Sequence, residues 1–195
     1  WITVSLFFCF YNSNLYDIII SNISLNGVWN LRILGIDPGL ATIGYALVDK
    51  KTNHFEVLEY GVIKTSADKE DIERLEIIHR NIEALIKEFK PEQMAVEELF
   101  FNKNVKTAIA VGQARGVILL AGSQAGIKVA EYTPLQIKQA VVGYGRADKK
   151  QVQLMVKSLL NLSEIPKPDD AADALAISIC HGHVYSAHSG WEERL

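Results

Sequence analysis

The order of extended and helical segments constrains the fold of this chain more than any other feature of its sequence. Three extended apolar segments come first, and their short, turn-like connections predict an antiparallel meander. Helical and extended patterns then alternate, which predicts a mixed α/β sheet of five strands with helices on its faces. The predicted strands span residues 32–37, 42–49, 54–63, 93–98 and 127–132, and the main predicted helices span 71–89, 105–124 and 170–185.

Capping motifs mark two further helices between the last strand and the last helix. Thr133, Pro134 and Gln136 form an N-cap, a first-turn proline and a capping box. Asp148 and Gln151 repeat the capping box, so residues 143–147 (GYGRA) are expected to form an exposed, basic loop. Ala108, Gly112 and Gly116 recur at every fourth residue of the helix at 105–124, and we expect this row of small residues to let another element approach closely.

Acidic residues stand at the ends of two predicted strands and at the start of the last helix. Asp37 ends the first strand, and Glu97 ends the first strand after the meander. If these two strands are parallel neighbours, both carboxylates emerge at the same edge, where α/β folds bind their ligands. Asp170 and Asp173 are three residues apart and share a helix face, and Ala171 and Ala172 between them let that helix lie flat against the sheet.

Four carboxylates at one edge call for cations, because their mutual repulsion would otherwise raise their pKa values until some were neutral. Oxygen ligands without a His or Cys cluster favour Mg²⁺, with Mn²⁺ as a substitute. Two such ions about 3.5–4 Å apart are typical of in-line phosphoryl transfer. Each acid also has a purely structural interpretation. Asp37 suits a turn, Glu97 a solvated strand end, Asp170 an N-cap and Asp173 the first turn of a helix.

The charge distribution points to a polyanionic partner more clearly than the net charge does. The whole chain carries a formal charge of −3. Residues 101–157, however, contain only two acids, Glu131 and Asp148, against a set of basic residues: Lys103, Lys106, Arg115, Lys128, Lys138, Arg146, Lys149, Lys150 and Lys157. Such asymmetry is typical of nucleic-acid binding, and a basic surface kept for solubility is the alternative.

The cysteines and the first thirty residues indicate the expected compartment and domain organisation. Cys9 and Cys180 have no metal-type spacing, and the default compartment is a reducing cytoplasm. Residues 1–30 are aromatic, β-branched and almost uncharged, and they are too interrupted by polar residues for a transmembrane helix of roughly 20 apolar residues. We interpret them as non-native or upstream-translated sequence, or else as an extra strand or hairpin. One domain is then expected over residues 31–185, with a C-terminal tail at 186–195.

Four stretches of the sequence resemble the RuvC family of bacterial Holliday junction resolvases. They are ILGIDPGLATIGYALVD, AVEELFFNKNVKTAIAVGQARGVIL, YTPLQIKQAVVGYGRADKKQVQLMV and PDDAADALAISICHGH, and together they span about Leu31 to Tyr185. The second stretch is the one most specific to this family. Family members typically begin with Met at the position of Leu31, which suggests a leucine codon used as the start.

The resemblance implies a ribonuclease H-like fold, a homodimer, and a nuclease that nicks two opposed strands of a four-way DNA junction in recombination and repair. The expected products carry 5′-phosphate and 3′-hydroxyl ends. Carried over by motif, the metal-binding and catalytic acids are Asp37, Glu97, Asp170 and Asp173, with Asp169 as the alternative to Asp170. Two Mg²⁺ ions per site and a partnership with the RuvA–RuvB branch-migration complex are implied as well.

The same resemblance suggests the residues that contact DNA. Phe100 matches an aromatic residue that stacks at the junction centre, and Phe101 is its neighbour, although core packing is the alternative for both. Lys138 and Lys149 match basic positions near the scissile phosphate. His181 and His183 are interpreted as structural, or as indirect supports of a metal ligand. The remaining candidates for DNA binding are Lys103, Lys106, Arg115, Arg146 and Lys150.

Three other functions are weighed against this one. Another ribonuclease H-like nuclease, such as a YqgF-type enzyme, would share Asp37 but not VEELFFNKN and GQARG. An actin-like ATPase or sugar kinase also opens with a strand, an acid and a glycine turn, but it needs two such domains. A module that binds junctions without cutting them would not need four acids.

Overall fold

The predicted order of strands and helices is confirmed by the structure, a computed structural model that describes residues 30–99 and 105–192, with side chains for 30–99 and 108–185. The strands are β1 (Asn30–Asp37), β2 (Thr42–Lys51), β3 (Phe55–Lys64), β4 (Gln93–Glu97) and β5 (Lys128–Tyr132). The helices are α2 (Asp71–Phe89), α3 (Val105–Gln124), α4 (Pro134–Val142), α5 (Lys149–Leu159) and α6 (Asp169–Glu192). Of the predicted extension at residues 1–30, only Asn30 falls among the described residues.

All five strands form one mixed sheet in the order β3-β2-β1-β4-β5. Strand β1 pairs with β2 antiparallel, and β2 pairs with β3 antiparallel, as the predicted meander requires. On its other side β1 pairs with β4 parallel, with Ile36 opposite Val96, and β4 pairs with β5 parallel. Asp37 and Glu97 therefore emerge side by side at one edge of the sheet, as the sequence predicts.

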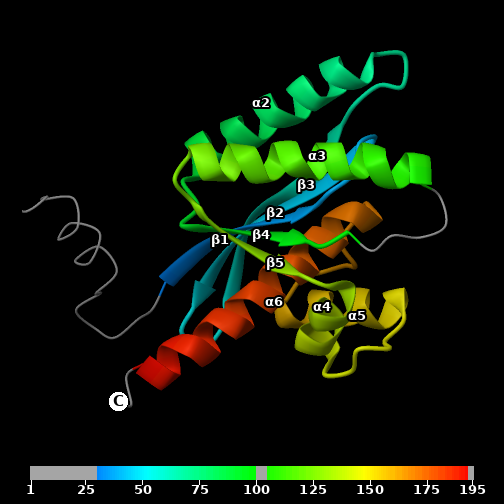
Figure 1. Cartoon of the computed structure of the whole chain (residues 1–195). Coiled ribbons are helices and arrows are strands. Elements are labelled where there is room, and N and C mark those ends of the chain that lie inside the picture. Colours follow the sequence, from blue (N-terminus) through cyan, green and yellow to red (C-terminus); the bar gives the residue numbers. More distant parts are fainter. Residues whose placement is uncertain (1–29, 100–104, 193–195) are drawn as a thin grey trace, which may run out of the picture.

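Helices cover both faces of this sheet (Figure 1). Helices α2 and α3 lie on one face, and α6 lies on the other with α4 and α5 beside it. The strands alternate accordingly: Leu34 and Ile36 of β1 are buried in the cluster with α2 and α3, whereas Ile33 belongs to the cluster with α6. Asp37 has the parity of Ile33, and so the first candidate acid lies on the α6 side.

Helix α6 lies on β1 and β2 at very short range, because glycines stand where it crosses these strands. A Cβ atom at Gly35 would lie 2.5 Å from the backbone oxygen of Ala174 and 2.2 Å from Ser178 Oγ. A Cβ atom at Gly182 of the helix would lie 2.4 Å from the ring of Phe55. The alanines between the two acids, Ala171 and Ala172, are buried, as expected for a helix that lies flat on the sheet.

Most of the predictions made from local sequence motifs are confirmed. Thr133 and Asp148 cap α4 and α5, each with the reciprocal capping box. Helix α6 is longer than predicted, because no proline follows Tyr185 to end it, and it runs to Glu192 through most of the predicted tail. The close approach expected along the row of small residues in α3 is not seen at Gly116, whereas a Cβ atom at Gly112 would lie 3.6 Å from Leu99. At Gly116 a Cβ atom would meet no described atom within 4 Å, while Ala114 and Ile118 face the core instead.

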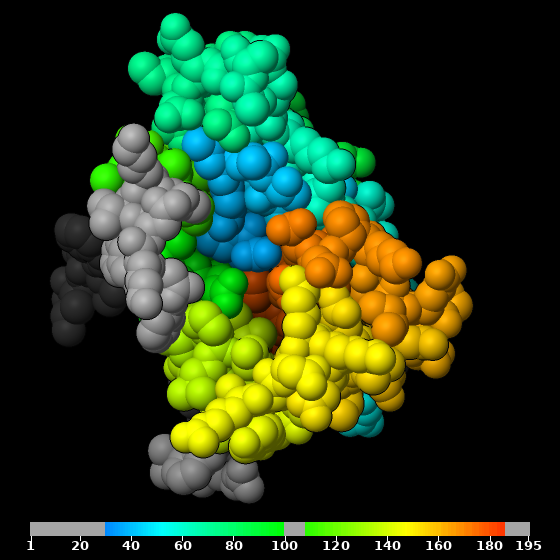
Figure 2. Space-filling view, turned by 90° about the vertical axis from the view of Figure 1, so that its right-hand side faces the viewer, coloured from blue at the N-terminus to red at the C-terminus, as the bar shows by residue number. Residues whose placement is uncertain are grey.

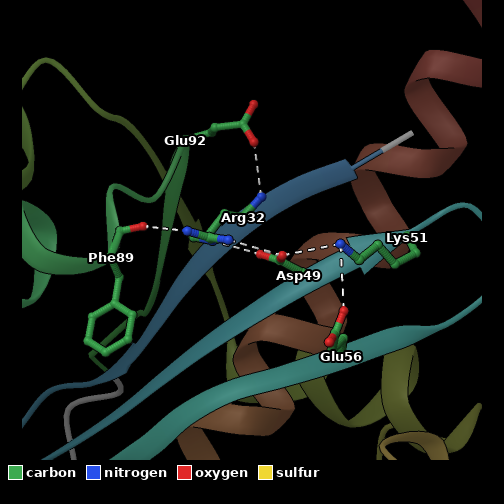
Figure 3. A network of polar contacts seen from close by, with 6 residues as sticks. All are labelled: Arg32, Asp49, Lys51, Glu56, Phe89 and Glu92. Atoms are coloured by element: carbon green, nitrogen blue, oxygen red, sulfur yellow. Dashed lines mark hydrogen bonds and ion pairs between the residues drawn. The ribbon is translucent and has the colours of Figure 1, made fainter. Parts of the chain in front are cut away.

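A polar network closes the sheet at the edge opposite to Asp37 (Figure 3). Asp49 of β2 is buried and accepts hydrogen bonds from Arg32 Nε at 2.8 Å and from Lys51 Nζ at 3.3 Å. Arg32 also donates from Nη1 to the carbonyl of Phe89, the last residue of α2, at 2.8 Å. Burial raises the pKa of Asp49, but the hydrogen bonds and charges of Arg32 and Lys51 outweigh it and hold that pKa below its usual value. The network ties β1, β2 and the end of α2 together.

The described helices contain none that is both long and apolar enough to cross a membrane.

Candidate active site

Asp37 is the centre of the predicted acidic site. It is the last residue of the central strand β1, and only part of it remains exposed. Burial, and then the charges of Glu97, Asp173 and Asp170, raise the pKa of Asp37 to about 8. The carboxylates that raise this pKa are the three others that the sequence singles out. The structure therefore brings all four predicted acids into one electrostatic cluster.

Gly44 explains how Asp170 reaches this cluster. It lies opposite Asp37 in the register of β1 and β2. A Cβ atom at Gly44 would lie 1.9 Å from the backbone oxygen of Asp170, so any side chain here would collide with the first turn of α6. The collision would be with backbone rather than with a flexible side chain, and it cannot be relieved without moving the helix. Gly44 thus sets how closely α6 approaches the end of β1.

We expect Gly44→Ala to push the start of α6 away from β1 and to lower the free energy of unfolding by about 1–3 kcal/mol, the usual effect of overpacking. Binding of Mn²⁺ should weaken as well, because Asp170 moves away from Asp37. Urea denaturation and a Mn²⁺ titration measure the two effects. The matched control is Gly116→Ala, where the added Cβ meets no atom of the described residues within 4 Å. Equal stability of the two variants would contradict the role assigned to Gly44.

Lys149 brings a positive charge into the cluster from the first position of α5, directly after the cap residue Asp148. Its Nζ lies 3.1 Å from Asp173 Oδ2 and 3.2 Å from Asp169 Oδ2. Burial lowers the pKa of Lys149, but the two carboxylates outweigh it and raise that pKa above its usual value. Asp169 is exposed and also accepts a hydrogen bond from Gln153, at 3.0 Å. Asp169 is not among the charges that raise the pKa of Asp37, whereas Asp170 is. This difference favours Asp170 over Asp169 as the metal ligand.

The donor set fits a hard divalent cation. Burial, and then the charge of Asp173, raise the pKa of Glu97, while burial also raises the pKa of Asp173. Carboxylates with raised pKa values release their protons when a cation replaces them. Among the side chains that the structure describes, no three His, Cys, Asp or Glu residues are spaced to hold an ion by themselves. Mg²⁺ suits such an open arrangement, because it keeps several waters and binds through one or two carboxylates together with substrate phosphates.

A pocket of about 220 Å³ opens beside the carboxylates, between α4, α5 and α6. Its polar wall carries Glu97, Asp173, Lys138 and Lys149, and its apolar wall includes Ile137 and other aliphatic residues. Figure 2 looks onto this edge of the sheet and shows a hollow bordered by the blue, green, yellow and orange segments. The charge of Lys138 acts on Glu97 across this pocket and lowers its pKa, against the larger effect of burial.

The other basic candidates are placed differently. Arg115 is mostly covered: its Nε donates to the carbonyl of Glu97 at 3.3 Å, and its Nη2 pairs with Glu131. It supports the strand end that carries Glu97, a role that the sequence did not reveal. Arg146 and Lys150 are exposed and lie close to Lys149 in the sequence. Phe100, Phe101 and Lys103 lie outside the described residues, as does the side chain of Lys106, so their predicted contacts with DNA stay predictions.

Comparisons with known proteins agree on one family. The sequence model described as "Crossover junction endodeoxyribonuclease RuvC" matches residues 33–181. A protein of that name from Halothermothrix orenii is 66% identical over 159 residues, which cover 82% of this chain and 96% of the relative. Another from Caldanaerobacter subterraneus subsp. tengcongensis is 58% identical over 153 residues, covering 78% of this chain and 93% of the relative.

The solved structures agree as well. Thermus thermophilus RuvC in complex with a Holliday junction substrate superposes with a TM-score of 0.77 at 39% identity, covering 81% of this chain and 96% of that one. The yeast mitochondrial Holliday junction resolvase Ydc2 shares the fold, with a TM-score of 0.59 at 14% identity, covering 85% of this chain and 86% of that one.

Proposed function

The chain belongs to the RuvC family of crossover junction endodeoxyribonucleases, and we propose that it resolves four-way DNA junctions by nicking two opposed strands. One observation carries this proposal. Asp37, Glu97, Asp170 and Asp173, which come from β1, β4 and α6, act on one another at a single edge of the sheet. Together with the relative solved on a Holliday junction, this cluster favours a nuclease over a module that only binds junctions.

The expected cofactor is a pair of divalent cations, Mg²⁺ by preference, held by Asp37, Glu97, Asp170 and Asp173. Bound there, such ions activate a water and stabilise the leaving oxygen of a phosphodiester. The residues of the chain supply the rest. The carboxylates hold the ions, and Arg115 fixes the carbonyl of Glu97. Lys138 and Lys149 stand on the pocket wall beside Glu97 and Asp173, where they can attract a DNA phosphate.

Hydrolysis in this geometry is expected to leave 5′-phosphate and 3′-hydroxyl ends. Symmetric nicking of two strands needs two copies of the site, and we propose a homodimer for this reason. The further proposals are a partnership with RuvA–RuvB, action in recombination and repair, and a cytoplasmic location, all of which follow from the family.

The direct test is a nicking assay with Mg²⁺ on a synthetic four-way junction, a flap and a linear duplex of the same arm sequences. We expect paired nicks at symmetric positions of the junction and little cutting of the duplex. Preferential cutting of the flap, or no cutting of any substrate, would contradict the proposal. Ligation of the nicked products without further processing tests the predicted ends.

Lys149→Ala tests the predicted DNA contact. If Lys149 neutralises one phosphate, the slope of log Kd against log salt should flatten by roughly 0.9, because one fewer counterion is released. Junction binding without divalent metal, measured at several salt concentrations, gives the slope. Lys157→Ala is the matched control: it removes the same charge from α5, but Lys157 does not line the pocket. A slope that does not change in Lys149→Ala would remove this residue from the DNA face.

A further inference from the structure

A buried histidine joins α6 to the two parallel strands. His181 Nδ1 lies 2.7 Å from the hydroxyl of Tyr132 at the end of β5, and its Nε2 lies 2.7 Å from Oε1 of Gln93 at the start of β4. The His181 side chain is almost inaccessible, and the ring of Tyr132 packs edge-on against it. We call these three residues the His181 bridge. The predicted active site does not use any of their side chains directly.

The chemistry of the three partners fixes the protons of the bridge. Oε1 of Gln93 only accepts hydrogen bonds, so Nε2 of His181 donates to it. Nδ1 then accepts from the hydroxyl of Tyr132. Both ring nitrogens are satisfied in a neutral imidazole. Burial, and then the charge of Lys128, lower the pKa of His181 to about 4, so the neutral form persists at neutral pH.

The bridge spans two elements that carry acids of the site. Gln93 is the first residue of β4 and Glu97 is the last, and the alternation along the strand puts both on the same face of the sheet. Asp173 lies on α6, about 12 Å before His181 at the usual helical rise. Glu97 and Asp173 repel each other, since the charge of Asp173 is the largest charge that acts on Glu97. Without a metal ion this repulsion opposes the close approach of α6 to β4, and the ion pair of Lys149 with Asp173 offsets only part of it. The packing of Gly35 and Gly44 holds α6 on β1 and β2, but those contacts do not reach β4.

Tyr132 also links the end of β4 to α6. It is the partner of Glu97 in the register of β4 and β5, and its carbonyl accepts a hydrogen bond from the backbone of Glu98 at 2.8 Å. Its backbone thus contacts the strand end that carries Glu97, and its hydroxyl contacts the helix that carries Asp173. The bridge acts on Glu97 from β5 and from the start of β4 at once.

We propose that Gln93, His181 and Tyr132 are positioning residues that hold α6 in register with β4, and thereby set the separation of Asp173 and Glu97 for divalent metal binding. This inference rests on the proposed metal site. It needs neither a DNA substrate nor the cutting reaction. It extends the site by three residues that do not contact the metal, of which Tyr132 and His181 are buried and Gln93 is partly buried.

The test compares Gln93→Met, which keeps the length of the side chain but cannot accept from Nε2, with Gln93→Glu, which retains an acceptor. Tyr132→Phe removes the single oxygen that donates to Nδ1. The readout is Mn²⁺ affinity of the DNA-free protein by electron paramagnetic resonance, with urea unfolding in parallel. We expect Gln93→Met and Tyr132→Phe to weaken Mn²⁺ binding by about 10-fold, the lower end of the usual effect for residues that support metal ligands.

Gln93→Glu should restore affinity to near that of the unchanged protein. The matched control is Ser178→Ala, which removes a buried hydrogen bond that stays within α6. Lower stability with unchanged Mn²⁺ affinity in Gln93→Met and Tyr132→Phe would overturn the proposal, and so would a Gln93→Glu variant as weak as Gln93→Met. If Gln93→Met does not fold, the milder Tyr132→Phe decides. A protein with an intact His181 bridge that binds Mn²⁺ but does not cut junctions would refute the proposed function and leave this inference standing.

Discussion

Asp37→Asn should abolish the nicking of a four-way junction in Mg²⁺ while leaving junction binding intact. Asparagine has nearly the same shape, but it removes the charge from the carboxylate on which the other three acids act. Metal ions contribute several kcal/mol of transition-state stabilisation. We therefore expect the rate to fall by about 10³-fold, which corresponds to ~4 kcal/mol. Single-turnover nicking and metal-free gel-shift assays measure the two quantities.

Glu98→Gln is the matched control for this variant, because Glu98 is an exposed acid next to Glu97. It should cut at close to the normal rate. An Asp37→Asn protein that also cuts at close to the normal rate would exclude Asp37 from the metal site. Loss of junction binding in Asp37→Asn would show instead that the substitution damages the fold.

The same substitution should change how stability depends on pH. The pKa of Asp37 rises from 3.8 to about 8 on folding, so the folded state holds a proton that the unfolded state has lost. Without metal, this group therefore opposes folding increasingly as the pH rises from about 4 to 8, and an asparagine at this position would remove that effect. Metal-free Asp37→Asn should be more stable than the unchanged protein at pH 8, and the difference should shrink toward pH 4.

Arg32→Met should cause the largest loss of stability among the predicted substitutions. Asp49 would remain buried with Lys51 as its remaining ion-pair partner in the network, and the carbonyl of Phe89 would lose a donor. Removing one partner of a buried ion pair costs about 3–5 kcal/mol, and the partial exposure of Arg32 places the expected loss near ~3 kcal/mol. For a chain of this size the melting temperature should fall by roughly 6–12 °C. Urea and thermal unfolding at pH 7 measure the effect.

Arg80→Met is the matched control, because Arg80 pairs with Glu76 on the exposed face of α2. That pair should contribute less than about 1 kcal/mol. Equal losses in Arg32→Met and Arg80→Met would show that the network does not stabilise the fold.

The contribution of Asp49 to stability depends on pH. The pKa of Asp49 is lowered on folding, so its stabilising effect is present above pH 3.8 and is lost as the pH falls further.

The fold could be predicted because its signals are local. Helix α2 has the predicted bounds, since its apolar spacing and the proline that follows it at position 91 are local signals. Helix α3 has the predicted bounds as well. The grouping of the four acids also follows from chain order, once the strands of Asp37 and Glu97 are taken as parallel neighbours. Strand pairing of this kind is set by topology rather than by residue type.

The supports of the site could not be predicted, because they depend on contacts between distant residues. Gln93 and Tyr132 are 88 and 49 residues away from His181, and nothing in their local sequence marks them as its partners. Gly44 looks like an ordinary strand glycine until α6 is placed over it. The pairing of Lys149 with Asp169 and Asp173 likewise depends on how α5 packs beside α6.

The position of α6 in the chain has a consequence for protein synthesis. Asp37 leaves the ribosome early, with the meander, but Asp170 and Asp173 follow every other strand and helix of the described fold. Domains generally fold as units, and a nascent chain that ends before α6 lacks two of the four acids together with the helix that covers one face of the sheet. The cluster is therefore completed only when the last helix docks on the first two strands. If the four acids hold the metal ions as proposed, a translation product truncated before α6 would lack two of them and should not cut DNA.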